Sequence, residues 1–291
     1  MGSPGRLSLR HALALGLAHG PTELLPISSS AHTILIPWLA GWPYAELDPE
    51  LRKSFEVALH AGTAAALLID LSSVEHRASI ATTARERDVR QALLIALSFI
   101  PPAIAGYTFE QLLQRRLSGP PTIAAGLLIG AAGMALADTR PPDGTRSLAD
   151  MSASDGLLLG LAQTLALVPG VSRSGAVLSA ARARGFSRID SHTLARRTGL
   201  PVILGAGALK TGRLIQRGMA GEAPIGDRRS AGALVLGGAT ALLSTLAATR
   251  LLRRGSLEQH DAAALWPHSL YRGLLASITI SRLRRAHNRD A

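Results

Sequence analysis

Two breaks in otherwise apolar sequence organise this chain: Pro169-Gly170-Val171-Ser172-Arg173-Ser174-Gly175 and, near the N-terminus, Glu23-Leu24-Leu25-Pro26-Ile27-Ser28-Ser29-Ser30-Ala31-His32. Each runs from apolar residues through a proline and a cluster of hydroxyls into another apolar stretch. A guanidinium among apolar residues is costly unless it meets an anion, and serines ahead of a helix start leave backbone N–H groups free for negative oxygens. The second break therefore predicts a phosphate site formed by Arg173, Ser172, Ser174 and the amides around Gly170 and Gly175.

Simpler explanations for the same residues stay open. Arg173 can instead extend to the membrane interface, and the serines can act only as helix caps.

The two breaks align with each other at a constant offset. Gly16–His19 matches Gly160–Gln163 and Ser28–Ala31 matches Ser172–Gly175, both displaced by 144 positions (160 − 16 = 172 − 28 = 144) in a chain of 291 residues. Short matches of Gly, Ala and Leu arise easily by chance, but the shared offset and proline favour a duplication. Duplicated membrane proteins place broken helices at corresponding positions of the two halves, with the binding site between them.

Long charge-free runs indicate a membrane protein. Residues 24–45, 91–109, 117–137 and 230–249 contain no Asp, Glu, Lys or Arg, and a helix needs about 20 apolar residues to cross a bilayer. The mean hydropathy of +0.22 is low for a membrane protein, so a soluble helical protein with a large core is the alternative.

The net charge of +11 comes almost entirely from arginine, since Lys53 and Lys210 are the only lysines. The arginines cluster between the apolar runs, for example in 85–90 and 282–285. This arrangement fits anionic lipid headgroups better than a duplex groove, so we expect no nucleic-acid partner. The chain has no cysteine, which excludes disulfides, zinc thiolates and a cysteine nucleophile.

The expected fold is one all-α integral membrane domain, 1–291, with six transmembrane helices plus two re-entrant helical hairpins in an inverted repeat. The first repeat, 1–140, begins with a hairpin at 7–40, and the second, 150–291, begins with a hairpin at 156–186. Three spans follow each hairpin. If the repeats are inverted, the hairpins enter from opposite faces and their tips meet near the midplane of the bilayer.

Within the first hairpin, Leu7–His19 is expected to be a half-helix that is retained, although its arginines and apolar run imitate a signal peptide. Pro21 and Pro26 are expected to break it. The predicted spans are 55–71, 91–113 (bent at Pro101-Pro102), 122–137, 198–216, 231–250 and 262–281, with a charged loop at 72–90.

The chain resembles the undecaprenyl-diphosphate phosphatases, the bacitracin-resistance family of bacterial membrane enzymes. The resemblance is carried by TELLPISSSAH (22–32), FEVALHAGT (55–63), IPPAIAG (100–106) and ALVPGVSRSG (166–175), in the order and spacing of the family. It implies a multi-pass protein of the bacterial inner (plasma) membrane. It also implies hydrolysis of a polyprenyl diphosphate lipid to the monophosphate carrier plus phosphate, in the recycling of the lipid carrier for peptidoglycan and cell-wall synthesis.

The resemblance also implies roles for particular residues. Ser29 matches the position of a nucleophile, with His32 handling its proton, and Arg173 clamps phosphate oxygens as a guanidinium fork. Glu23 is expected to hold a divalent cation, Mg²⁺ or Ca²⁺, together with His19 one turn earlier. The residues expected to contact the substrate are Ser28, Ser30, Gly170, Ser172, Ser174 and Gly175.

The chain departs from the family pattern at three places. His19 stands where relatives have Glu or Gln, and Ala31 stands where they have Gly. Leu194–Thr198 replaces an aromatic-serine-aromatic run and puts two arginines near an expected span. A neutral imidazole in place of a carboxylate weakens binding of hard ions such as Mg²⁺ and Ca²⁺ more than binding of Mn²⁺ or Zn²⁺.

Other functions compete with the diphosphatase. A polyprenyl-phosphate transporter or flippase is the main alternative, because inverted hairpins at the midplane suit alternating access. The nucleophile can also be Ser28, Ser30 or a metal-bound water in place of Ser29. A homodimer is possible, but no residue of the sequence specifies it.

Overall fold

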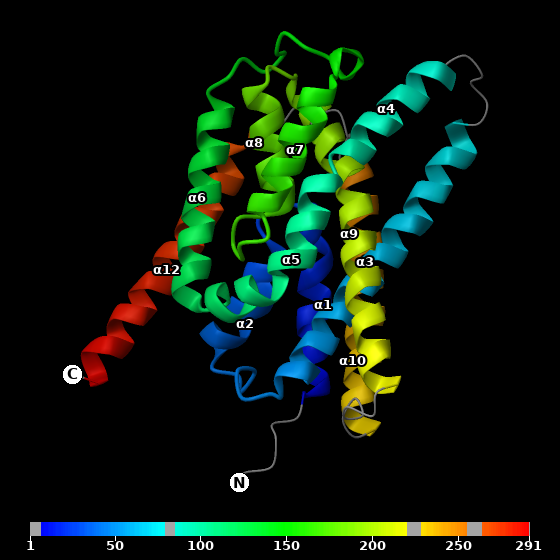
Figure 1. The fold of residues 1–291 in the computed structure, drawn as a ribbon. Helices are drawn as coiled ribbons and strands as arrows, with labels where there is room; N and C mark the ends of the chain where they lie inside the picture. Colours follow the sequence, from blue (N-terminus) through cyan, green and yellow to red (C-terminus); the bar gives the residue numbers. More distant parts are fainter. Residues whose placement is uncertain (1–6, 79–84, 220–227, 255–263, 291) are drawn as a thin grey trace. The chain divides into compact units, whose positions relative to one another are not determined.

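The computed structural model describes residues 7–78, 85–219, 228–254 and 264–290, and these residues are almost entirely helical (Figure 1). An isolated bridge between Arg146 and Phe186 is the β pairing found among them. The elements in chain order are α1 (Leu9–Leu24), α2 (Ser29–Ala40), α3 (Pro49–Ala78), α4 (Arg85–Leu97), α5 (Ile100–Leu117), α6 (Pro120–Asp138), the 3₁₀ turn Leu148–Asp150, α7 (Ala153–Leu165), α8 (Arg173–Ala183), α9 (Arg188–Met219), α10 (Arg228–Arg254) and α12 (Trp266–Asp290).

The chain forms two compact units, and each takes segments from distant parts of the sequence. The first unit comprises Met1–Leu24, His32–Ala78 and Ile203–Leu251, which include α1, α3 and α10. The second unit comprises Leu25–Ala31, Ser79–Val202 and Leu252–Ala291, which include the first break and α4 to α8 with α12.

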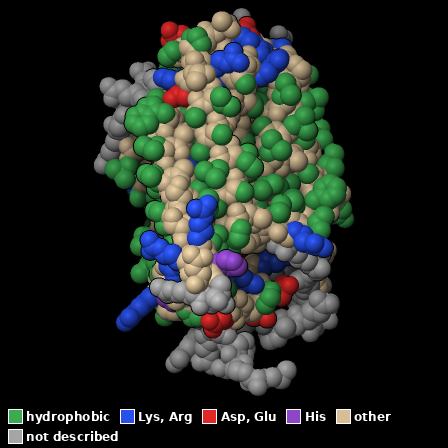
Figure 2. Space-filling model, turned by 90° about the vertical axis from the view of Figure 1, so that its left-hand side faces the viewer, with side chains coloured by type: hydrophobic (Ala, Val, Ile, Leu, Met, Phe, Trp, Pro, Cys, Tyr) green, Lys and Arg blue, Asp and Glu red, His purple; other side chains and the backbone are tan. Residues whose placement is uncertain are grey.

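Helices long and apolar enough to cross a membrane are present in the described part of the chain. By length and composition they are Val89–Phe109, Pro120–Asp138 and Ser230–Leu252. On the face drawn in Figure 2, hydrophobic side chains cover the middle and Lys and Arg side chains gather toward the two ends. This is the distribution that an apolar bilayer core with charged interfaces favours. The all-helical class and the membrane character predicted from the sequence are therefore confirmed.

Small residues bring the helices of the first unit into close contact. The N–H of Gly20 on α1 donates to Ser244 Oγ of α10 (3.2 Å), and Ser244 Oγ donates to Gly16 O (2.9 Å). On α3, Gly62 lies so close to Gly238 O that a Cβ has no room. Such close approach, with hydroxyls bonding across the interface, is how helices associate where water is absent.

Several predicted boundaries are wrong. Pro21 does not break the first half-helix, because α1 runs on to Leu24. The proline removes the helical hydrogen bond to the carbonyl of Leu17, four residues earlier, and the helix continues without that bond. The hydroxyl of Thr22 donates to Ala18 O and His19 O (2.9 and 3.1 Å), which adds side-chain hydrogen bonds to the neighbouring turn.

The predicted charged loop at 72–90 is also too long, since α3 extends to Ala78 and α4 begins at Arg85. The bend predicted at Pro101-Pro102 is a helix junction. The turn at Ser98 and Phe99 separates α4 from α5, and the prolines lie in the first turn of α5. A proline is tolerated there because that N–H has no helical partner.

Asp155 links the start of α7 to the end of α8 in the second hairpin. Its carboxylate is fully buried, caps α7 by accepting from Ser152 N (2.9 Å), and pairs with Arg146 (2.6 Å) and Arg184 (2.7 Å). The hydrogen bond to Asp155 raises the pKa of Arg146 above its ordinary value. The connector before α7 and the end of α8 are thereby held at one carboxylate.

We expect Asp155→Asn to destabilise the fold by about 3 kcal/mol, because it removes one charge from a largely buried ion-pair network. Thermal unfolding of the detergent-solubilised protein measures the change. Asp150→Asn is the matched control, since the exposed Asp150 carboxylate bonds only to Ser147 in the same connector. Equal loss of stability in the two variants would contradict this role for Asp155.

Candidate phosphate site and metal cluster

The second break places Arg173 at the start of a helix. Ser172 is the N-cap of α8, with φ of 63°, and its Oγ accepts from Gly175 N at 3.4 Å. Gly170 has φ of 100°, a left-handed conformation that glycine adopts without strain. The first-turn N–H groups of α8 are the usual donors to an anion at a helix N-terminus.

The first break repeats this geometry. Ser28 has φ of 74°, and its Oγ accepts from Ala31 N at 3.4 Å. The Ser28 and Ser30 hydroxyls are 3.1 Å apart, and those of Ser172 and Ser174 are 3.3 Å apart. Within the described residues, Ser28 and Ser172 are the non-glycine residues with positive φ. Strained backbone of this kind persists where the surroundings hold it, and it gathers at functional sites.

The two breaks meet inside the second unit. Ser174 Oγ donates to Leu25 O at 3.4 Å. Arg272 of α12, whose side chain is fully buried, donates through its guanidinium to Pro26 O (3.1 Å), Gly170 O (2.8 Å) and Val171 O (3.0 Å). One cation therefore binds backbone carbonyls of both breaks and fixes them against each other.

Sequence reasoning missed Arg272. The signal was present, because Arg272 is the single Asp, Glu, Lys or Arg residue in the expected span 262–281. A charge in such a segment marks a functional or structural site by default. The neighbouring helix α6 makes room for this side chain. Gly130 of α6 lies directly against the Arg272 guanidinium, where a Cβ has no room.

We expect Arg272→Lys to lower kcat/KM by about 100-fold, since a lysine keeps the charge but cannot reach carbonyls on both breaks, and charged hydrogen bonds are worth about 1.5–3 kcal/mol each. Arg182→Lys is the control. Arg182 is equally buried and binds the carbonyls of Arg140, Pro141 and Phe186, away from the breaks. Both variants should lose stability, but only Arg272→Lys should lose turnover per folded molecule. Equal turnover would make Arg272 a purely structural residue.

The remaining predicted residues lie as follows. Arg173 is half-buried, and its guanidinium lies against Gly199 of α9. Ser29 begins α2 and is half-buried, Ser30 is exposed, and His32 is buried one turn further along the same helix. Gly175 packs between Met134 and Arg272, where a Cβ would lie 3.0 Å from each.

A cluster of possible metal ligands lies in the first unit. Because α1 is continuous through Pro21, His19 and Glu23 occupy one face, one turn apart. His60 of α3 completes the group, and the ligand atoms of His19, Glu23 and His60 all lie within 4.8 Å of one another. The His19 and His60 rings are 4.8 Å apart in an edge-to-face arrangement.

The orientation of His60 fits metal binding. Its Nδ1 lies 2.7 Å from Glu56 O. A carbonyl can only accept, so Nδ1 carries the proton and Nε2 presents a lone pair. Histidine ligands usually donate their second N–H to a carbonyl or carboxylate in this way. The sequence analysis did not predict His60 as a ligand, because its partners His19 and Glu23 come from another helix.

Taken together, the fold and these residues define a class of protein. It is a helical membrane protein with two serine-capped helix breaks, which Ser174 and Arg272 link to each other, and with a cluster of possible cation ligands. The model of the family described as bacitracin resistance protein BacA matches residues 12–278. The chain belongs to this family.

Curated relatives agree over nearly the full length. The chain is 39% identical over 285 residues to an undecaprenyl-diphosphatase of Geobacter sulfurreducens, covering 95% of this chain and 99% of the relative. It is 35% identical over 289 residues to an undecaprenyl-diphosphatase of Pelobacter propionicus, covering 94% and 98%. An undecaprenyl-diphosphatase of Thermomicrobium roseum is 33% identical, with 94% and 99% covered.

Proposed function

We propose that this protein is an enzyme that hydrolyses undecaprenyl diphosphate to undecaprenyl phosphate and phosphate, and so recycles the lipid carrier of cell-wall synthesis. Relatives that match this chain over almost their whole length are named undecaprenyl-diphosphatase, and the chain belongs to the BacA family. The observation that carries the proposal is the junction of the two breaks. Arg272 and Ser174 hold them together, and Arg173 starts the helix that follows.

Electrostatics supports a phosphate group as the ligand of the second break. Arg173 supplies a planar fork for two phosphate oxygens, and the hydroxyls and amides between Gly170 and Gly175 supply neutral donors. Phosphoryl transfer depends mainly on positioning and on neutralising the charge of the transferred group. A cradle fixed by Arg272 meets the first requirement, and Arg173 meets the second.

Ser29 is the proposed nucleophile. Its Oγ attacks the terminal phosphorus, the bond from that phosphorus to the bridging oxygen breaks, and undecaprenyl phosphate leaves. His32 takes the hydroxyl proton, and water then releases phosphate from the serine. Ser29 opens α2 with its side chain half-buried, at the end of a helix whose N–H groups favour negative charge.

His19, Glu23 and His60 fit a divalent cation. Two imidazoles and one carboxylate form the donor set of many catalytic zinc sites, and Mg²⁺ or Ca²⁺ prefer more oxygen. When bound, such an ion would supply positive charge at this cluster. Mg²⁺ and Ca²⁺ remain the ions predicted from the family, while this donor set favours Mn²⁺ or Zn²⁺.

We further propose the layout of six spans and two re-entrant hairpins in the bacterial plasma membrane. The equal offset of Ser28 and Ser172, and their shared backbone geometry, support a duplicated hairpin. The breaks carry backbone polar groups that helices cannot satisfy, which is tolerated at membrane depth only where protein or a polar cavity surrounds them.

Phosphate release tests the function. The purified protein is given undecaprenyl diphosphate in detergent with each divalent cation in turn, and inorganic phosphate is measured. Release of one phosphate per substrate, absent in Ser29→Ala protein, is the expected result. No release with any cation, combined with movement of polyprenyl phosphate across vesicles that contain the protein, would replace the enzyme with a transporter.

A further inference from the structure

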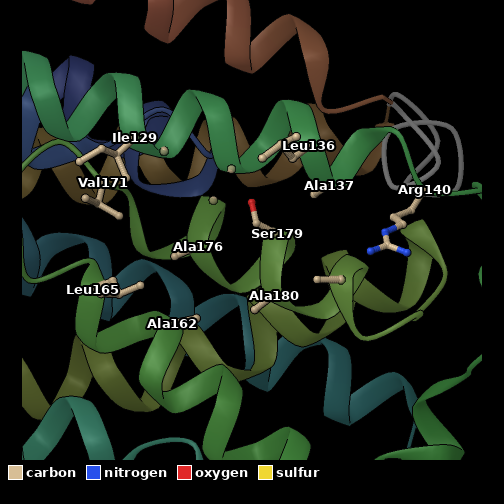
Figure 3. A pocket seen from close by; sticks show the side chains of 14 residues that line it. Ile129, Leu136, Ala137, Arg140, Ala162, Leu165, Val171, Ala176, Ser179 and Ala180 are labelled. Carbon is tan, nitrogen blue, oxygen red and sulfur yellow. The ribbon is translucent and has the colours of Figure 1, made fainter.

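An apolar groove runs along the second hairpin and reaches the second break at Val171 and Gly175. It has a volume of about 370 Å³ and lies between α6 on one side and α7 with α8 on the other. Figure 3 shows Val171 and Ile129 at one end, Arg140 at the other, and Ser179 between them. All of these residues belong to the second unit.

Small side chains create the groove. Gly133 of α6 faces Ser179 of α8, and a Cβ on Gly133 would still be 3.7 Å from the Ser179 hydroxyl. Its rim is formed by large aliphatic side chains that are mostly exposed: Ile129 (64%), Leu136 (71%) and Leu165 (65%). In a membrane protein such side chains face lipid, so the groove opens to the hydrocarbon of the bilayer.

Arg140 places a positive charge at one end of the otherwise apolar groove. It follows the end of the candidate span Pro120–Asp138, where an interface is expected, and its side chain is exposed. Nearby Asp138 is engaged by Arg188 (2.6 Å) and by Trp266 N (3.0 Å). Among the described residues, no carboxylate lies within ion-pair distance of Arg140. A cation therefore remains available at the outer end of an apolar groove.

The groove touches the second break without reaching its arginine. Val171 and Gly175 of the break line the groove, whereas Arg173, the expected phosphate ligand, is not a lining residue and lies against Gly199 of α9. A ligand in the groove therefore contacts the break at Val171 and Gly175, while its charged end lies at Arg140.

We propose that this groove binds one anionic phospholipid of the surrounding bilayer, with the phosphate at Arg140 and an acyl chain along α8 toward Val171. If each carbon takes about the 30 Å³ of a water molecule, the groove holds roughly a dozen carbon atoms, the greater part of one acyl chain. The lipid packs against the break that Arg272 holds, at Val171 and Gly175, with its phosphate at Arg140 and not at Arg173.

A photoreactive phosphatidylglycerol, with a diazirine in its acyl chain, tests the site without turnover. The full chain is placed in phosphatidylcholine nanodiscs with a small fraction of the probe, irradiated, and the labelled peptides of α6 and α8 are quantified. Arg140→Gln should lower their labelling about five-fold, since one arginine near a membrane surface contributes about 1 kcal/mol to anionic lipid binding. Arg116→Gln, which removes an exposed arginine in the last turn of α5, just before the opposite end of α6, should leave it unchanged.

Two further variants and a second lipid probe identify the molecule that occupies the groove. Gly133→Leu and Ser179→Leu fill the groove and should abolish labelling of its peptides. A neutral phosphatidylcholine probe should label them at least five-fold less than the anionic probe. Equal labelling by the two probes, or unchanged labelling in Arg140→Gln, overturns the proposal. Displacement of the anionic probe by undecaprenyl diphosphate also overturns it and assigns the groove to the prenyl chain. Phosphate release is measured separately, so failure here leaves the proposed enzyme activity standing.

Discussion

Purified Arg173→Lys protein is expected to release phosphate about 1,000-fold more slowly than the unchanged protein, at the same folded fraction. An arginine that stabilises the transferred phosphoryl group is worth about 10³–10⁵ in kcat. Lysine keeps the positive charge but loses the fork that holds two oxygens at once. The start of α8, where Ser172 caps the helix and Arg173 follows, provides no second cation within that turn.

The control is Arg184→Lys at the opposite end of the same helix, where the guanidinium donates to Asp155 at 2.7 Å. That change keeps a positive charge beside Asp155, far along α8 from Arg173, and should leave kcat within about three-fold. The measurements are phosphate release and thermal unfolding on the same preparations. Near-normal turnover in Arg173→Lys protein would remove Arg173 from the catalytic residues and make it an interfacial arginine.

The sequence predicted the breaks well because their chemistry is local. A proline, a serine cluster and a following apolar run specify a capped helix start, and both α2 and α8 begin one residue after the first serine of the cluster. The break predicted at Pro21 is wrong because a proline inside a membrane helix costs one hydrogen bond, and packing against a neighbouring helix can offset that loss. Here Gly16 and Gly20 of α1 bond to Ser244 of α10 in the turn of the helix just before the proline.

The contacts of the site were harder to predict because they join distant segments. Arg272 reaches Pro26, which is 246 positions away in the sequence, and no local pattern specifies such a partner. His60 shares this property, since its ligand partners lie on α1. Both residues could be marked as unusual polar groups in apolar helices, but their partners required the fold.

Glu23→Gln is expected to lower the rate at saturating metal by at least about 100-fold and to abolish the response to added divalent cation. Glutamine has the shape of glutamate but no charge, and a metal ligand set with one carboxylate loses its single anionic donor. Metal binding is followed by calorimetry on the solubilised protein, independently of activity. Glu50→Gln, an exposed change in the first turn of α3, is the control and should keep both properties.

His19→Glu then tests which cation the cluster prefers. A second carboxylate one turn before Glu23 adds an oxygen donor and a negative charge, so the Mg²⁺ or Ca²⁺ concentration at half-maximal rate should fall by about ten-fold. Binding of Zn²⁺ or Mn²⁺ should gain less, because imidazole already suits these ions. His19 is buried with its ring against His60, so a wholly structural role predicts lost stability and an unchanged metal preference. That result would leave Glu23 as a ligand with another partner and remove His19 from the cluster.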